Sequence, residues 1–122
     1  MNFGCTGAVC VIKTATGLPA DTVIFDNENE IIGVTATASG RTGDTSVIVS
    51  GVVHISVPST VRTPSRPAGL WLKKTLPRAH KDGHYTIVTS ATVRIDKKAI
   101  VGRILKISPS HGGRKEVCVR LP

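Results

Sequence analysis

The sequence has few aromatic residues and no long apolar run. Phe, Trp and Tyr together make up 3% of the 122 residues. A membrane-spanning helix needs roughly 20 apolar residues in succession, and no segment approaches that length. The opening residues, MNFGCTGAVCVIKTATG, place no cationic residue before their short apolar run. We therefore expect no membrane attachment and no secretion signal.

Cysteine is also scarce, with Cys5, Cys10 and Cys118 the three examples. An odd number without a secretion signal favours free thiols in a reducing compartment. Cys5 and Cys10 are five residues apart, which would put them on opposite faces of a strand and makes them a poor pair of metal ligands. We expect structural cysteines, with no metal site and no cofactor.

Patterns that mark enzymes are missing too. Neither Gly-x-Gly-x-x-Gly nor Gly-Lys-Ser/Thr occurs, so no phosphate-binding loop is predicted. His80, Asp82 and His84 share one basic turn, but a metal site there would need a further ligand. No serine or cysteine is marked as a nucleophile beside a base. The sequence thus predicts a protein without catalytic residues.

Acidic residues are few and unevenly placed. Residues 1–61 hold two basic and five acidic side chains, net −3, whereas residues 62–122 hold fourteen basic and three acidic, net +11. Such asymmetry suggests a polyanion or an acidic protein surface as the partner. A basic face that is simply solvated is the alternative.

Period-two alternation, rich in Val, Ile and Thr, dominates what remains. This pattern, with turn residues about every ten positions, is typical of an all-β sandwich or barrel. We predict one compact all-β domain, residues 1–122, with a β core from residue 8 onward and about eight short strands. The nine candidate segments for these strands are Ala8–Lys13, Thr22–Phe25, Ile31–Ala38, Thr45–Val57, Gly69–Lys73, Tyr85–Thr89, Thr92–Ile95, Ile100–Ile107 and Glu116–Leu121.

Three features stand out along this pattern. In Thr45–Val57, one face carries Val47, Val49, Gly51, Val53, Ile55 and Val57, and Gly51 in the middle suggests a bulge or bend. Residues 58–68 hold three of the seven prolines and predict an extended surface loop. Residues 1–7 have little to pack against and predict a flexible N-terminal arm.

Nucleic-acid binding is the first function to weigh, because basic residues concentrate between Arg62 and Lys81. Proteins that bind single-stranded nucleic acid combine such a basic patch with aromatic side chains on which bases stack. This chain has four aromatic residues, and Phe25 lies in an apolar strand. A nucleic-acid-binding β-barrel that uses residues 62–81 therefore stays an alternative rather than the preferred interpretation.

The order of six short motifs along the chain favours a different function. The motifs are Ala20-Asp21-Thr22-Val23-Ile24-Phe25-Asp26, Glu30-Ile31-Ile32-Gly33-Val34-Thr35-Ala36, Gly40-Arg41-Thr42-Gly43, Ser50-Gly51-Val52-Val53-His54-Ile55, Ala99-Ile100-Val101-Gly102-Arg103-Ile104-Leu105 and Glu116-Val117-Cys118-Val119-Arg120-Leu121. In this order, over about residues 18–121, the chain resembles the small all-β capsid cement, or head decoration, proteins of tailed bacteriophages, a family once labelled recombinase-like. It differs at Val53 and His54, where the family often has Phe or Tyr.

The resemblance implies a structural virion protein with no catalysis. Family members bind the outside of the phage head where capsid subunits meet, commonly as homotrimers, and strengthen the shell against packaged DNA. The implied partner is the major capsid protein, and no membrane or specific nucleic acid is expected. The chain would be made in the host cytoplasm and reside on the capsid surface. Another virion part, such as a tail or head-completion protein, remains a further possibility.

Contact residues follow as hypotheses from this resemblance and from the charge pattern. The N-terminal arm is expected to add a strand to the shell protein, and the basic half to face acidic capsid surface. The expected capsid contacts are Met1, Asn2, Phe3, Arg62, Arg66, Lys73, Lys74 and Arg78. The expected trimer contacts are Trp71 and His54.

Overall fold

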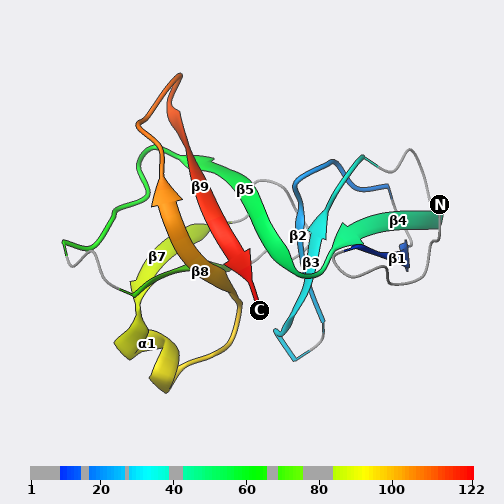
Figure 1. Ribbon diagram of the computed structural model, residues 1–122, viewed down its shortest axis with the longest axis horizontal. Helices are drawn as coiled ribbons and strands as arrows, with labels where there is room; N and C mark the ends of the chain where they lie inside the picture. Colours follow the sequence, from blue (N-terminus) through cyan, green and yellow to red (C-terminus); the bar gives the residue numbers. More distant parts are fainter. Residues whose placement is uncertain (1–8, 15–16, 27, 39–42, 66–68, 76–83) are drawn as a thin grey trace.

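Two antiparallel β-sheets and one short helix make up the protein (Figure 1). The computed structural model describes residues 9–14, 17–26, 28–38, 43–65, 69–75 and 84–122. The elements are β1 (Val9–Thr14), β2 (Val23–Phe25), β3 (Ile31–Thr35), β4 (Gly43–Ile48), β5 (Gly51–Pro58), β6 (Leu70–Lys74), β7 (Tyr85–Thr89), α1 (Ser90–Ile95), β8 (Ile100–Ile107) and β9 (Arg114–Leu121). The prediction of a compact all-β domain is confirmed, and the described strands form two sheets that do not close into a barrel.

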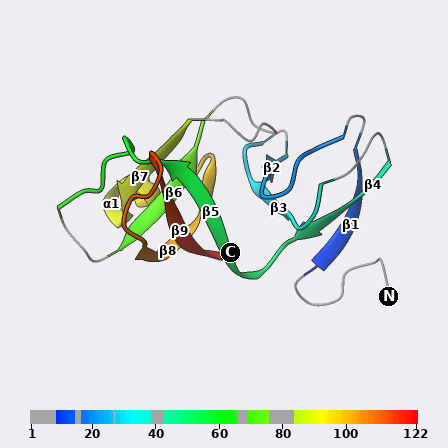
Figure 2. The same cartoon turned by 90° about the horizontal axis from the view of Figure 1, so that it is seen from above.

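Each sheet is built from one continuous part of the chain. The first sheet has the strand order β1-β4-β3-β2, and the second has the order β5-β9-β8-β6-β7. The two sheets lie side by side along the long axis, with β1 and β4 at one end and α1 at the other (Figures 1 and 2). Because residues 49–61 carry no Asp, Glu, Lys or Arg, the acidic and basic halves of the sequence coincide with the two sheets.

The chain passes between the sheets at Gly51. The sequence predicted one strand over Thr45–Val57, and this is wrong, because β4 ends at Ile48 and β5 begins a new sheet at Gly51. Gly51 has φ +95°, a conformation that side-chain-bearing residues rarely adopt. The bend expected at this glycine is therefore the crossover itself. The alternation within β5 is as predicted, since Val53, Ile55 and Val57 are buried.

One hydrophobic core extends across both sheets. β2 and β3 contribute Val23, Phe25 and Val34, and the larger sheet contributes the rest. The members from the larger sheet are Val53, Ile55, Val57, Leu70, Leu72, Tyr85, Ile87, Val101, Val117, Val119 and Leu121. Full burial of one such side chain stabilises the fold by about 1.5–3 kcal/mol. Burial of this cluster therefore favours contact between the two sheets.

Residues Thr92–Ile95 form part of helix α1 and not the expected strand. The backbone N–H of Asp96 donates to the carbonyl of Thr92 over 2.8 Å, as in a helical turn. The β-branched residues here favour a strand, but the segment leaves the sheet after β7, and no described strand lies beside it to pair with. It buries none of its residues, and Ile95 is 89% exposed.

Two glycines allow neighbouring strands to approach closely. A Cβ atom on Gly33 in β3 would lie 2.3 Å from the carbonyl oxygen of Ile48 in β4. A Cβ atom on Gly102 in β8 would lie 2.2 Å from the carbonyl oxygen of Arg120 in β9. Real Cβ atoms essentially never come this close, so each position requires glycine. Both glycines fall in motifs that carry the family resemblance.

The cysteine expectation needs one correction. Cys10 in β1 is disulfide-bonded, so the prediction of three free thiols is wrong for this residue, and its partner lies outside the described residues. Cys118 is a free thiol and is partly buried. Its predicted position is confirmed: it alternates with the buried Val117 and Val119.

Two further predicted segments are seen in part or not at all. The expected loop 58–68 is described as far as residue 65 and contains no strand beyond Pro58, the last residue of β5. Its first turn closes where the backbone N–H of Val61 donates to the carbonyl of Pro58 over 3.1 Å. The expected arm, residues 1–7, lies outside the described residues.

Candidate interaction surface

The outer face of the five-stranded sheet carries a row of side chains that crosses every strand. The pairing registers put these residues opposite one another on adjacent strands. From β7 to β5, the row consists of Val88, Trp71, Arg103, Arg120 and Val52. We call these five residues the outer row. Its two arginines and Val52 are exposed, and Trp71 and Val88 are half-buried.

Arg103 and Arg120 make this surface electrostatically unusual. They lie directly opposite each other on β8 and β9, and both are exposed. Like charges in that relation destabilise a sheet, because the two side chains repel across adjacent strands. An acidic partner placed over the pair would offset this cost. The sequence analysis missed these two residues, because their opposition depends on strand register.

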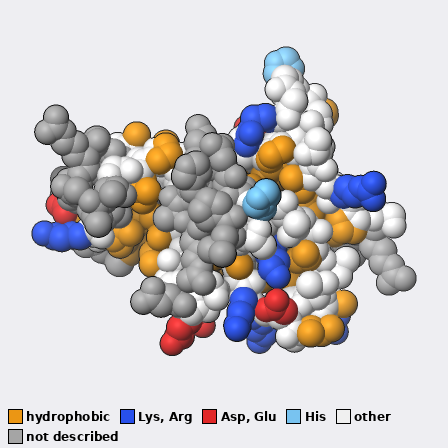
Figure 3. All heavy atoms as spheres, turned by 180° about the vertical axis from the view of Figure 1, so that it is seen from behind, with side chains coloured by type: hydrophobic (Ala, Val, Ile, Leu, Met, Phe, Trp, Pro, Cys, Tyr) orange, Lys and Arg blue, Asp and Glu red, His pale blue; other side chains and the backbone are white. Residues whose placement is uncertain are grey.

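A bulge in β8 adds to the same face. The β8–β9 register shifts between Ile104 and Lys106. The shift leaves Leu105 and Lys106 both exposed, where strict alternation would expose one of them. Figure 3 shows Lys and Arg side chains beside exposed hydrophobic ones at the end of the molecule that holds the larger sheet. Mixed apolar and cationic surfaces of this kind suit protein partners better than bare phosphate chains.

His54, one expected trimer contact, lies on β5 with its side chain exposed. Its Nδ1 is 2.9 Å from Oε1 of Glu116 on β9, which is an ion pair when the imidazole is protonated. Nearby, Arg114 donates from Nε to Oγ of Ser56 over 2.8 Å and from Nη2 to the Ser56 carbonyl over 3.1 Å. The described contacts of His54 are thus within one protomer, and its role in a trimer stays a prediction.

Trp71, the other expected trimer contact, is half-buried in β6. Its Nε1 donates a hydrogen bond to Oγ of Ser90 over 3.1 Å, and Oγ of Ser90 in turn donates to the carbonyl of Gly69 over 2.9 Å. The indole thus has its polar edge satisfied inside the protomer while part of the ring stays accessible. A trimer contact through Trp71 stays a prediction.

Lys73 and Lys74 were both expected to contact the capsid, and the structure separates them. Lys73 points outward, and its Nζ donates to Oδ2 of Asp96 over 3.3 Å. Lys74 is 1% exposed, so the expectation of a surface contact there is wrong. The reason is strand alternation, which sends adjacent residues of β6 to opposite faces.

Lys74 instead joins the two sheets. Its Nζ donates to the backbone carbonyl of Val23 in β2 over 3.3 Å. It also lies 5.6 Å from the ring centroid of Tyr85, its cross-strand neighbour on β7, within the range of a cation–π contact. Its role is therefore structural.

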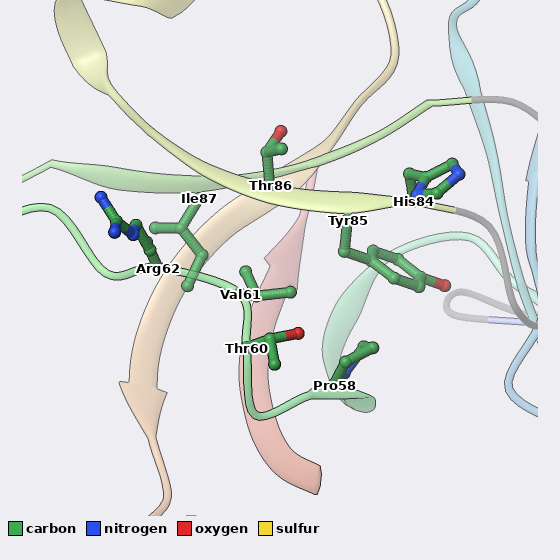
Figure 4. A pocket seen from close by; sticks show the side chains of 8 residues that line it. All are labelled: Pro58, Thr60, Val61, Arg62, His84, Tyr85, Thr86 and Ile87. Atoms are coloured by element: carbon green, nitrogen blue, oxygen red, sulfur yellow. The ribbon is translucent and has the colours of Figure 1, made fainter. Parts of the chain in front are cut away.

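Arg62 is the expected capsid contact that lies at a groove. The groove has a volume of about 550 Å³ and runs between β7 and the segment that follows β5. Its lining residues are Pro58, Thr60, Val61, Arg62, His84, Tyr85, Thr86 and Ile87. In Figure 4, Tyr85 and Ile87 point toward the segment with Pro58 and Val61, whereas Thr86 points away. We call this feature the β7 groove.

The remaining expected contacts, Met1, Asn2, Phe3, Arg66 and Arg78, lie outside the described residues. Within the described ranges, no group of three His, Cys, Asp or Glu side chains is placed to hold a metal ion. The short α1, the one helix in the described part of the chain, does not have the length to span a membrane.

Comparisons of the chain with protein-family models, with curated proteins and with solved structures find no match.

Proposed function

We propose that this chain is a capsid decoration, or cement, protein of a tailed bacteriophage. In this role it binds the outer surface of the head where subunits of the major capsid protein meet. It stabilises the shell against the pressure of packaged DNA, and it acts as a homotrimer without catalysis or cofactor. The chain is made in the host cytoplasm and ends on the outside of the virion.

The order of motifs over residues 18–121 carries this proposal. Two of those motifs contain Gly33 and Gly102, and each glycine lies where a Cβ atom would meet the backbone of the next strand. These steps of the resemblance therefore fall at positions where this two-sheet fold requires glycine, which supports the proposal. The resemblance does not depend on a local site.

The charge of the surface supports the same function. The larger sheet comes from the half of the chain with net charge +11, and the like charges of Arg103 and Arg120 lie opposite each other on its outer face. A trimer that touches several shell subunits gains avidity, because contacts after the first are effectively intramolecular and often worth about 10²–10⁴-fold. Individually weak basic patches are then sufficient.

The direct test uses heads of the phage that encodes this chain, prepared without it. Purified full chain is mixed with expanded heads, the heads are sedimented, and the decorated particles are reconstructed by electron microscopy. We expect density spread over the whole shell where subunits meet. Density confined to one vertex would indicate a head-completion protein, and no binding to the heads would overturn the proposal.

A DNA titration separates the alternative. Binding through residues 62–81 predicts affinity for DNA that falls steeply with salt. We expect tight binding to heads and little binding to free DNA. Charge reversal at Arg62, Arg66 and Lys73 should reduce binding to heads most at low salt.

The arm is tested by deletion. A chain without Met1–Gly7 should fold as before but bind heads more weakly, because the arm is proposed to add a strand to the shell protein. Equal binding by the truncated chain would remove the arm from the proposal and leave the rest intact.

A further inference from the structure

In the part of the chain that the structure describes, β7 is an edge strand that lacks the usual protection. It lies at the end of the strand order β5-β9-β8-β6-β7. Its residues, Tyr-Thr-Ile-Val-Thr, include no charge and no proline, and its pairing with β6 contains no bulge. Proteins commonly blunt exposed edges with such devices, because unpaired backbone groups are a template for another strand. The outer side of β7 is therefore suited to pairing at Ile87.

The backbone groups that face away from β6 can be assigned from the register. The N–H of Thr75 donates to the carbonyl of His84 over 2.7 Å, which makes these residues a hydrogen-bonded pair. Because bonded and non-bonded pairs alternate in an antiparallel ladder, Ile87 turns its N–H and C=O away from β6. No hydrogen bond to these two groups is found within the part of the chain that the structure describes.

The opposite edge of the same sheet, β5, differs. There the guanidinium of Arg114 donates to the Ser56 carbonyl over 3.1 Å, and Pro58 ends the strand without an N–H. One outward carbonyl of β5 is thus already occupied and its end is blocked. The comparison favours β7 as the edge that receives a strand.

The β7 groove lies beside this edge and matches the needs of an added strand. A strand paired with β7 would direct every second side chain toward the groove, over the apolar surfaces of Val61, Tyr85 and Ile87 (Figure 4). Arg62 is exposed at the same groove and provides a positive charge. The volume of about 550 Å³ is in the usual range for binding pockets.

We infer that β7 accepts an extended segment of the shell protein, which pairs with the backbone at Ile87 and places an acidic side chain against Arg62. This inference rests on the proposed function and names the acceptor site within it. The charge of Arg62 selects the occupant. The chain's own opening residues, 1–8, contain no Asp or Glu, so a second copy's arm would leave Arg62 without an opposite charge.

Hydrogen exchange on the full chain, free and bound to expanded heads, tests the inference directly. Within residues 85–89, we expect the outward-facing amide of Ile87 to exchange about tenfold or more slowly on the heads, because the open edge becomes paired. Binding to heads without protection of this segment overturns the inference and leaves the proposed function standing. Absence of binding overturns both. Protection that appears without heads and grows with protein concentration would assign the edge to a second copy and overturn the inference.

Matched variants test the two contacts separately. Ile87→Pro and Ile87→Ala both remove the buried side chain, but only the proline removes the outward N–H. We expect Ile87→Pro to bind heads at least about tenfold more weakly than Ile87→Ala. Arg62→Glu should also weaken binding, whereas Arg94→Glu, the same change on the exposed face of α1, should not. Equal binding within both pairs overturns the inference. If Ile87→Pro does not fold, the arginine pair and the exchange measurement decide.

Discussion

The ammonium group of Lys74 lies 3.3 Å from the backbone carbonyl oxygen of Val23 and links the larger sheet to the smaller one. Both residues are buried. An aliphatic stem that passes through the core and ends on a carbonyl gives the cation a partner where water is excluded. This contact, with the shared apolar cluster, holds the two sheets in one arrangement.

Replacing Lys74 should therefore destabilise the fold. We expect Lys74→Ala to lower the free energy of unfolding by about 2–4 kcal/mol, since it leaves a cavity and an unpaired carbonyl. Lys73→Ala, on the exposed face of the same strand, should lower it by less than about 1 kcal/mol. Urea unfolding of both variants measures the difference. If both variants lose the same free energy of unfolding, the link to Val23 contributes nothing to stability.

The close strand contacts at glycine predict a second set of stability changes. Gly33→Ala and Gly102→Ala should each cost about 3 kcal/mol or more, because the neighbouring backbone must move. Gly112→Ala is the control, since its Cβ meets open space and the cost comes from φ +60° alone, about 1–2 kcal/mol. Thermal or urea unfolding of the three variants measures these losses of stability. A Gly102→Ala variant as stable as Gly112→Ala would contradict the close approach of β8 and β9.

The arginine pair of the outer row predicts opposite effects on stability and binding. Arg103→Glu converts repulsion with Arg120 into attraction, so we expect the free energy of unfolding to rise by about 0.2–1 kcal/mol. Arg103→Gln should fall between this variant and the original chain. If the outer row contacts an acidic shell, the glutamate variant should bind heads more weakly at low salt. Unchanged binding would remove Arg103 from the contact surface.

Asp96 predicts a pH effect. Its pKa lies below the ordinary 3.8, first because the backbone N–H of Lys98 donates to the carboxylate and second because Lys73 does. A lowered folded-state pKa stabilises the fold fully above the unfolded-state pKa, and this contribution is lost as pH falls through the folded value. We therefore expect Asp96→Asn to be less stable than the original chain at neutral pH, with the difference vanishing in acid.

An NMR titration of the Asp96 carboxyl checks the cause. Lys73→Ala should move the pKa partly back toward its ordinary value, because the bond from Lys98 remains. If the pKa of Asp96 is the same in Lys73→Ala as in the original chain, the hydrogen bond from the Lys98 backbone causes the whole lowering.

Alternation predicted local structure well where one face of a strand is buried. Val53, Ile55 and Val57 point inward, and Val117 and Val119 do the same, as the period-two pattern indicated. The same pattern ran through Gly51 without revealing that the chain changes sheets there. A strand and its continuation beyond a bend give one periodic sequence, so periodicity alone cannot place such a crossover.

The candidate surface was less predictable, because it depends on pairing. The opposition of Arg103 to Arg120 requires the β8–β9 register, which is shifted by a bulge. Composition placed Lys73 and Lys74 in one basic patch, although the pleat sends them to opposite faces. Thr92–Ile95 is helical despite its β-branched residues, and among the described strands none lies beside it to pair with.

The division of the chain into two consecutive sheets has an electrical consequence. With negative residues gathered in one lobe and positive ones in the other, the molecule possesses a permanent dipole along its long axis. An acidic surface exerts a torque on such a body at distances of about one Debye length, about 8–10 Å at moderate ionic strength. If the partner surface is acidic, as proposed, each copy would approach it with the basic larger sheet leading.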